Sequence, residues 1–378
     1  MMTAFGLTLA LCLPVLAGFQ DAPSLKDLAE VHKIEIGANF PGLVDGKAPN
    51  NWSASSIIEI EKSLAKKHFT MMSGGWESYP GSVWPAPNTV SLQGNKKLFQ
   101  WMEEQSMRTH YHGLGYGVRT PWLKSLPVRT KEEKLSVKAV YESMLQSTVI
   151  ALRGRVDLYD LCNEQLLPQY QSSGYSTAES YWRAYIPDGS KGSNWIDATF
   201  RLVRRLDPQP KLIYLDFNNE VICPKSDFLF SEMKKLKTGG TPIDGVGFQL
   251  HLDTELNRRK GHGIETDDAY LKSLRANLMR FSDAGFDVWV TEFDISVFPE
   301  KGLAIELKRQ AELYQEVMAV LLEIPRLRGV KFWGLLDKNV WGETLPARSN
   351  LFDEKGKPKA AYWGIVKALR SAKVLQRL

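Results

Sequence analysis

Apolar and polar positions follow two recurring patterns along the chain. Short apolar runs rich in β-branched and aromatic residues, typical of buried strands, alternate with longer stretches whose apolar residues recur at helical spacing. We read eight strand-then-helix cycles. The predicted strands span residues 33–40, 68–73, 107–113, 157–163, 211–217, 245–252, 287–295 and 330–336. The clearest predicted helices span residues 55–67, 132–152, 195–206, 269–284 and 303–322.

Eight β-then-α units in one chain favour an α/β protein built as a single closed (β/α)8 TIM barrel. The chain has 378 residues, which is enough for one barrel of about 250 residues or more. No long Pro/Gly linker or sequence repeat divides it. A doubly wound open sheet is the alternative, but such a sheet usually has a glycine-rich phosphate-binding turn after its first strand. None follows Ile36-Gly37-Ala38-Asn39.

The N-terminus is an apolar run from Met1 to about Phe19, interrupted by Pro14. We interpret residues 1–22 as a signal peptide and residues 23–378 as the barrel domain. We therefore expect a secreted or periplasmic protein without stable membrane insertion after processing. An uncleaved anchor is the alternative, because no Lys or Arg precedes the apolar run; this run is short for a membrane-spanning helix of about 20 residues.

Composition limits the classes of partner and site. The 48 basic and 43 acidic residues give a net charge of +5 without basic blocks, so we expect no nucleic-acid partner. Cys12 lies in the apolar N-terminal run, and Cys162 and Cys223 are too few for a disulfide framework. The sequence contains no His/Cys cluster with zinc-like spacing. We expect no metal, no organic cofactor and a monomeric protein.

Polar residues stand at the ends of several predicted strands. In a closed parallel barrel the reactive groups gather at the C-terminal ends of the strands, so these residues are candidates for a site. They are Asn163 and Glu164 on the fourth strand, Asp216 and Asn218 on the fifth, Gln249 and His251 on the sixth, Glu292 and Asp294 on the seventh, and Trp333 and Asp337 on the eighth.

Glu164 and Glu292 are the candidate catalytic pair. Hydrolysis of a glycosidic bond with retention needs two carboxyl groups about 5 to 5.5 Å apart, one protonated to assist departure and one ionised to attack the anomeric carbon. The fourth and seventh strands face each other across the mouth of a closed barrel. Either residue alone could be a solvated strand-end carboxylate, but each lies in an apolar strand beside Asn or Asp. We predict Glu164 as general acid/base and Glu292 as nucleophile.

His251 and two tryptophans complete the predicted site. Alternation along neighbouring strands predicts that His251 hydrogen-bonds Glu292 and is oriented by Asp294, which would keep the nucleophile ionised. A satisfied core histidine is the alternative. Indole rings are good platforms for the flat faces of sugars, and Trp333 and Trp341 follow the eighth strand. The alternative for both is that they plug the mouth of the barrel.

At these residues the sequence resembles glycoside hydrolase family 10, whose typical members are endo-β-1,4-xylanases. The resemblance runs from about residue 34 to 369. Tyr-Asp-Leu-Cys-Asn-Glu at 159–164 follows the family motif Trp-Asp-Val-Val-Asn-Glu, and Thr-Glu-Phe-Asp-Ile at 291–295 follows Thr-Glu-Leu-Asp-Ile. Further matches to the sixth strand, the eighth strand and the closing segment lie at 242–252, 332–341 and 351–362.

The resemblance implies a fold, an activity and roles for particular residues. The fold is the barrel, and the activity is retaining hydrolysis of a β-1,4-linked polysaccharide or oligosaccharide, most typically xylan. Asn163 would bind the sugar 2-hydroxyl, a contact that strengthens in the transition state. The other implied contacts to the reacting sugar come from Gln249, His251, His112, Trp333 and Trp341. Leu-Asp-Phe-Asn at 215–218 resembles the family's Asn-Asp-Tyr-Asn, which includes Asn218 among the binding residues.

The sequence also departs from the family pattern on the glycone side. Gly75, Trp76 and Tyr79 stand where xylanases usually carry Glu-Asn and a following Lys, and Tyr116-Gly117 replaces a Trp-His pair. Hydrogen bonds to a hydroxyl are what let a site reject analogues strongly, so these changes affect substrate identity more than bond cleavage. Two alternatives therefore remain: a β-glycosidase of the same fold acting on another glycan, and a carbohydrate-binding barrel without turnover.

Overall fold

The computed structural model of the chain describes residues 22–40, 55–115, 120–164, 193–256, 264–337 and 348–377. The described strands are β1 (Glu35–Phe40), β2 (Met71–Gly74), β3 (Arg108–Tyr111), β4 (Leu158–Asn163), β5 (Lys211–Asp216), β6 (Gly245–Phe248), β7 (His251–Asp253), β8 (Asp287–Ser296) and β9 (Leu327–Phe332). The described α-helices are α1 (Leu25–Val31), α2 (Ser55–His68), α3 (Pro80–Val83), α4 (Gln93–Glu104), α5 (Pro121–Lys124), α6 (Lys131–Leu152), α7 (Ser193–Leu206), α8 (Pro224–Thr238), α9 (Asp267–Asp283), α10 (Leu303–Leu322) and α11 (Ala360–Ser371). Two 3₁₀ helices, η1 (Trp76–Ser78) and η6 (Pro299–Lys301), lie between them.

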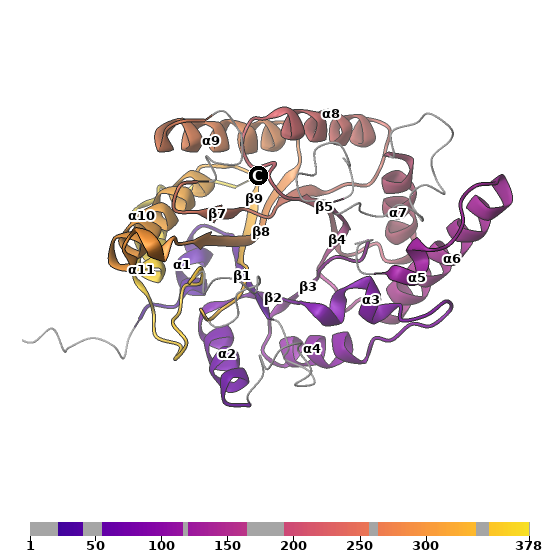
Figure 1. The fold of residues 1–378 in the computed structure, drawn as a ribbon, viewed down its shortest axis with the longest axis horizontal. Helices are drawn as coiled ribbons and strands as arrows, with labels where there is room; N and C mark the ends of the chain where they lie inside the picture. Colours follow the sequence, from indigo (N-terminus) through magenta and orange to yellow (C-terminus); the bar gives the residue numbers. More distant parts are fainter. Residues whose placement is uncertain are drawn as a thin grey trace, which may run out of the picture.

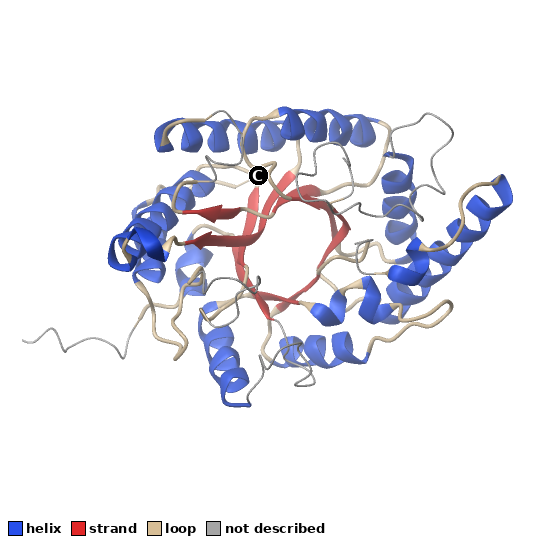
Figure 2. Ribbon diagram, in the orientation of Figure 1, coloured by secondary structure: helices blue, strands red, loops and turns tan. Residues whose placement is uncertain are grey.

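The strands form a closed barrel with helices around it (Figures 1 and 2). All strand pairs are parallel, in the order β6-β5-β4-β3-β2-β1-β9-β8, and β6 pairs with β8 to close the ring. The prediction of a single (β/α)8 barrel is confirmed. None of the helices in the described ranges is both long and apolar enough to cross a membrane. The predicted signal peptide lies almost entirely outside these ranges and stays a prediction.

Most predicted strand ends differ from the observed ends by no more than two residues, but two predicted strands are displaced by three residues or more at one or both ends. The strand predicted at 68–73 begins only at Met71, because α2 continues to His68. The strand predicted at 330–336 runs from Leu327 to Phe332, so Trp333 lies just beyond it. Gly334 follows with a φ of 111°, a conformation that glycine adopts without steric cost. The apolar residues after Trp333 therefore belong to the core but not to the strand.

The predicted strand 245–252 is interrupted in the middle. β6 and β7 are separated by two residues, and Leu250 has a φ of 65°, which is uncommon for a residue with a side chain. The interrupted segment still follows β8, because the backbone N–H of Glu292 donates to Gln249 O at 3.0 Å. Such irregularities often re-aim side chains next to active sites.

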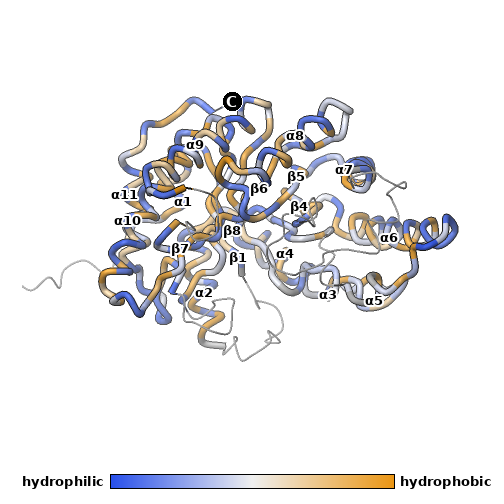
Figure 3. Tube along the Cα trace, turned by 45° about the horizontal axis from the view of Figure 1, so that its top comes forward, coloured by the Kyte–Doolittle hydropathy of each residue, from blue (hydrophilic) through white to orange (hydrophobic). Residues whose placement is uncertain are grey.

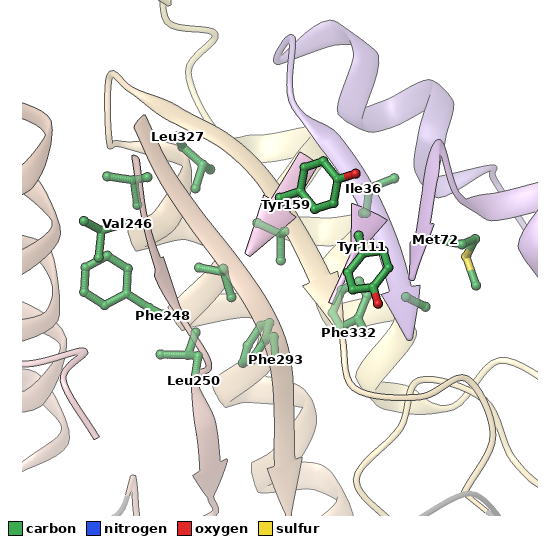
Figure 4. Close-up of a cluster of buried hydrophobic side chains, with 14 of the residues drawn as sticks. Ile36, Met72, Tyr111, Tyr159, Val246, Phe248, Leu250, Phe293, Leu327 and Phe332 are labelled. Atoms are coloured by element: carbon green, nitrogen blue, oxygen red, sulfur yellow. The ribbon is translucent and has the colours of Figure 1, made fainter. Parts of the chain in front are cut away.

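The core has two parts. A large cluster fills the space between the barrel and its helices, and Figure 4 shows its side chains from several strands, with Phe293 and Phe332 stacked at 5.8 Å between ring centres. Figure 3 shows apolar segments along the central strands and polar segments on the outer helices. A second, small cluster lies within the barrel and consists of Met71, Leu158, Ile213 and Trp289.

The long helix α6 shows how local sequence sets an element. Thr130 is its N-cap, with the side chain accepting a hydrogen bond from the backbone N–H of Glu133 while the Glu133 side chain accepts one from Thr130. This reciprocal arrangement satisfies two backbone donors that the first helical turn leaves free. The buried residues then recur at helical spacing: Val137, Tyr141, Met144, Leu145, Thr148, Val149 and Leu152.

The closing seam between β6 and β8 generates a prediction about stability. A Cβ atom on Gly245 would lie 2.3 Å from the backbone oxygen of Asp287, so Gly245→Ala should force the two strands apart. We expect a loss of about 1 to 3 kcal/mol in the free energy of unfolding, measured by urea denaturation. Gly239→Ala is the control, because its Cβ would meet backbone no closer than 3.4 Å at an ordinary φ of −73°. Equal stability of the two variants would contradict the argument.

Candidate active site

Glu164 is presented at the end of β4 by an unusual backbone conformation. Its φ is 59°, in the left-handed region that costs energy for a residue with a Cβ and that often occurs at functional sites. Its backbone N–H donates to Leu215 O at 3.0 Å, which fixes the turn against β5. The side chain is partly exposed. The residue is thus held at the rim of the barrel and is accessible from the C-terminal side of the strands.

Gln249 connects Glu164 to its neighbour Asn163. The Gln249 amide Nε2 donates to Glu164 Oε1 at 2.7 Å and to Asn163 Oδ1 at 3.2 Å. Gln249 and Asn163 are both buried. The amide therefore fixes the rotamer of the partly exposed carboxyl from below, and three of the predicted site residues share one hydrogen-bonded group.

Glu292 is a buried carboxylate held by His251. It is 3 % exposed, and its Oε2 lies 3.0 Å from His251 Nε2, while His251 Nδ1 lies 3.1 Å from Asp294 Oδ1. Both predicted hydrogen bonds of His251 are thus present. Burial alone would lower the pKa of His251, but Asp294 and Glu292 outweigh it and raise that pKa to about 10. The imidazolium therefore donates to both carboxylates at neutral pH.

His112 approaches Glu292 from the other side. It follows β3, is 1 % exposed, and places Nε2 at 3.8 Å from Glu292 Oε1. The Tyr79 hydroxyl lies 3.5 Å from the same Nε2 atom. Glu292 Oε1 has no hydrogen-bond partner within the described part of the chain. A buried carboxylate oxygen without a partner is costly in a resting protein and marks the atom that is available to react.

Trp333 forms an aromatic wall beside both histidines. Its ring centre lies 5.2 Å from that of His112 and 6.0 Å from that of His251, both nearly edge-on. Trp341, Gly117 and Tyr116 lie outside the described residues, as does the side chain of Trp76, so their predicted positions stay predictions. Asn218 follows β5 with a left-handed φ of 49°, and its sugar contact also stays a prediction.

Sequence reasoning missed a second set of buried polar residues beneath the carboxylates. Asp160 Oδ2 lies 2.7 Å from His112 Nδ1 and 3.1 Å from His110 Nε2. Lys331 Nζ donates to His110 Nδ1 at 3.0 Å and to Ser73 Oγ at 2.6 Å. A lysine in the apolar strand Val-Lys-Phe and a second histidine two residues before His112 were the available signals.

His110, His112 and Asp160 lie close enough together to be considered as ligands of a metal ion. Its three possible ligand atoms lie within 4.8 Å of one another. Burial alone would raise the pKa of Asp160, but His112 and the hydrogen bonds from both histidines outweigh it, and that pKa lies below its usual range. Both histidines already donate to the carboxylate, and the adjacent Lys331 ammonium repels a second cation. The residues therefore fit a hydrogen-bonded group better than a metal centre.

The arrangement combines one buried carboxylate, fixed by an imidazolium, with one partly exposed carboxyl at the same end of the barrel. Such a pair can perform nucleophilic attack on an anomeric carbon and proton transfer to a leaving oxygen.

Comparisons with known proteins agree with this chemistry. The sequence model of Glycosyl hydrolase family 10 matches residues 38–368. The chain belongs to glycosyl hydrolase family 10.

Two relatives and one solved structure match most of the chain. Endo-1,4-beta-xylanase B from Thermotoga neapolitana is 30% identical over 355 residues, which are 92% of this chain and 92% of that protein. Beta-1,4-xylanase from Dictyoglomus thermophilum is 29% identical over 81% of this chain and 84% of that protein. The crystal structure of xylanase 10B from Thermotoga maritima superposes with a TM-score of 0.77 at 30% identity, covering 92% of this chain and 98% of that one. The chain is therefore a glycoside hydrolase, which hydrolyses O-glycosyl bonds.

The charge state of His251 can be tested directly. Because its pKa is raised from 6.5 to about 10, its charged form stabilises the fold fully below pH 6.5, and this contribution is lost as the pH rises through about 10. We expect the ¹⁵N resonances of its ring to show the imidazolium at pH 8, with assignment from a His251→Gln variant. Titration of His251 near pH 6.5 would contradict the proposed pairing with Glu292 and Asp294.

Proposed function

We propose that this family member is a retaining endo-1,4-β-xylanase, with Glu292 as nucleophile and Glu164 as general acid/base. The observation that carries the proposal is the contrast between the two carboxyls. Glu292 is buried and lies 3.0 Å from Nε2 of the His251 imidazolium. Glu164 is partly exposed and hydrogen-bonded to a neutral amide, an environment in which a proton can be carried and exchanged.

The reaction follows from these two environments in two displacements. In the first, Glu292 attacks the anomeric carbon from one face of the sugar, the bond to the leaving oxygen breaks, and the proton of Glu164 passes to that oxygen. In the second, Glu164 takes a proton from a water molecule, the resulting hydroxide attacks the anomeric carbon, and Glu292 leaves as a carboxylate. Two inversions give net retention, and no proton or electron is gained or lost overall.

The neighbouring residues have roles in binding. Gln249 and His112 lie next to Glu164 and Glu292, and Asn163 is hydrogen-bonded to Gln249. The Asn163 amide Nδ2 can donate to a hydroxyl of the reacting sugar, while Gln249 Oε1 and His112 Nε2 can accept from one. The Trp333 ring can stack on an apolar sugar face. The relatives named above as xylanases support xylan as the substrate class, and the aromatic Tyr79 on the glycone side favours shorter or differently decorated xylan fragments at that subsite.

Export from the cytoplasm is part of the proposal. The apolar run from Met1 to about Phe19, which is followed by polar residues, supports a signal peptide. A polymeric xylan substrate lies outside the cell, so export would bring the enzyme to it.

Replacing the nucleophile should abolish turnover without loss of binding. We expect Glu292→Gln to lower kcat on xylan by at least about 10⁴-fold, because the covalent intermediate cannot form. Wild-type enzyme treated with a 2-deoxy-2-fluoro-β-xylobioside should gain the mass of one glycosyl group, mapped to Glu292 by peptide mass spectrometry. Glu104→Gln, an exposed site on α4, is the matched control. Labelling of another carboxylate would remove Glu292 from its role.

Replacing the acid/base should affect substrates according to their leaving groups. We expect Glu164→Gln to lower kcat on xylan by about 10²- to 10⁴-fold. The rate at which a dinitrophenyl β-xyloside glycosylates Glu292 should fall much less, because its leaving group needs no protonation. Added azide should restore turnover and yield a β-glycosyl azide, detected by NMR. An α-azide, or no difference between leaving groups, would contradict the assignment.

A further inference from the structure

Lys331 is a charged side chain buried inside the barrel, directly below the site. It lies on β9 and is 4 % exposed. Its Nζ donates to Ser73 Oγ on β2 at 2.6 Å and to His110 Nδ1 on β3 at 3.0 Å. Gly37 on the adjacent strand β1 leaves room for the aliphatic stem, since a Cβ there would lie 3.3 Å from Lys331 Cγ. The lysine therefore crosses the barrel interior and ends among polar groups.

The contacts of Lys331 and Asp160 determine where the ring protons of His110 and His112 lie. An ammonium group can only donate, so His110 Nδ1 accepts and the proton of the neutral ring is on Nε2. Burial and the Lys331 charge lower the pKa of His110 to about 3, so the ring is neutral. His110 Nε2 donates to Asp160 Oδ2, and His112 Nδ1 donates to the same oxygen. The chain of hydrogen bonds ends at His112 Nε2, which faces the nucleophile Glu292.

Lys331 also adds a positive charge beneath Glu292. Burial lowers the pKa of Lys331 to about 8, against the opposing attraction of Asp160 and Glu292. The ammonium is therefore charged throughout the acid range in which carboxylates titrate. Glu292 is faced by His112 after β3 and by His251 on β7, and Asp294 lies behind His251. The Lys331 charge on β9 attracts Glu292 through the barrel interior.

We propose that Lys331 is a positioning residue for the hydrolysis: it holds the His110 ring with its proton toward Asp160, which in turn orients His112, and it supplies a positive charge that attracts the Glu292 carboxylate from the barrel interior. The inference rests on the proposed function, because it concerns the nucleophile of that reaction. Lys331 touches neither sugar nor water in this scheme. Its effect passes through the three residues of the chain and through its charge.

The pH dependence of kcat/KM tests the effect on the nucleophile. We expect Lys331→Met to move the acid limb for an aryl β-xyloside to higher pH by about half a pH unit or more, since removing a positive charge makes Glu292 easier to protonate. Lys211→Met is the matched control, because Lys211 starts β5 at the opposite end of the barrel and its side chain is 49% exposed. Its acid limb should coincide with that of the wild type. An unmoved limb in a folded Lys331→Met variant would overturn the proposal.

The tautomer of His110 tests the proposal without any variant of Lys331 and without turnover. In ¹⁵N-histidine-labelled wild-type protein we expect the His110 ring to carry its proton on Nε2 at pH 6, assigned against a His110→Gln variant. A proton on Nδ1 would be incompatible with the Lys331 contact and would overturn the proposal. The proposed function fails separately: a wild type that hydrolyses neither xylan nor aryl β-xylosides would reject the xylanase, whatever the tautomer of His110.

Discussion

The site depends on the pairing of charges inside a closed barrel. A charge that leaves water costs several kcal/mol unless an opposite charge or several hydrogen bonds receive it. Here each described charge near the barrel axis has such a partner. His251 stands between Glu292 and Asp294, and the neutral ring of His110 joins Lys331 to Asp160. The carboxylate proposed for attack thus lies beside positive charge that the barrel holds in place.

The barrel divides along its axis into layers with different tasks. The small cluster of Met71, Leu158, Ile213 and Trp289 fills the interior with apolar side chains. Above it, Ser73 and Lys331 belong to a polar layer, and the two catalytic candidates lie at the strand ends beyond that layer. The apolar layer excludes water from below, so the electrostatic interactions in the polar layer are stronger than they would be in water. The stability of the fold and the charge state of the site are thus linked through one continuous interior.

The eight-strand architecture could be predicted because each strand and helix has its own periodicity. The pairs formed by His251 with Glu292 and Asp294 could be predicted as well, because alternation along neighbouring strands places these side chains on one face. The residues at which strands and helices begin and end could not be predicted equally well. Neither the continuation of α2 to His68 nor the end of β9 at Phe332 changes the hydrophobic pattern, so the pattern alone does not locate them.

The polar layer and the backbone of Glu164 were not predictable for a different reason. Lys331, His110 and Asp160 come from strands separated by up to 221 residues in sequence, and only the register of the closed barrel brings them together. The left-handed φ of Glu164 is likewise a product of tertiary structure, since no glycine marks the position. Family motifs identify residues that touch a substrate more readily than residues that act from beneath them.

The residues predicted for the glycone side differ from the family pattern, while the residues predicted to break the bond keep it. Tyr79 places its hydroxyl 3.5 Å from His112 Nε2, and its ring centre lies 5.5 Å from that of the histidine. An aromatic residue thus contacts a group that faces Glu292, at a position where the resemblance predicts a polar side chain. Stacking on an aromatic ring distinguishes sugars less sharply than hydrogen bonds to individual hydroxyls do. The groups that break the bond come from the strands, and those that select the sugar come from the loops, so the second set can change while the first is retained.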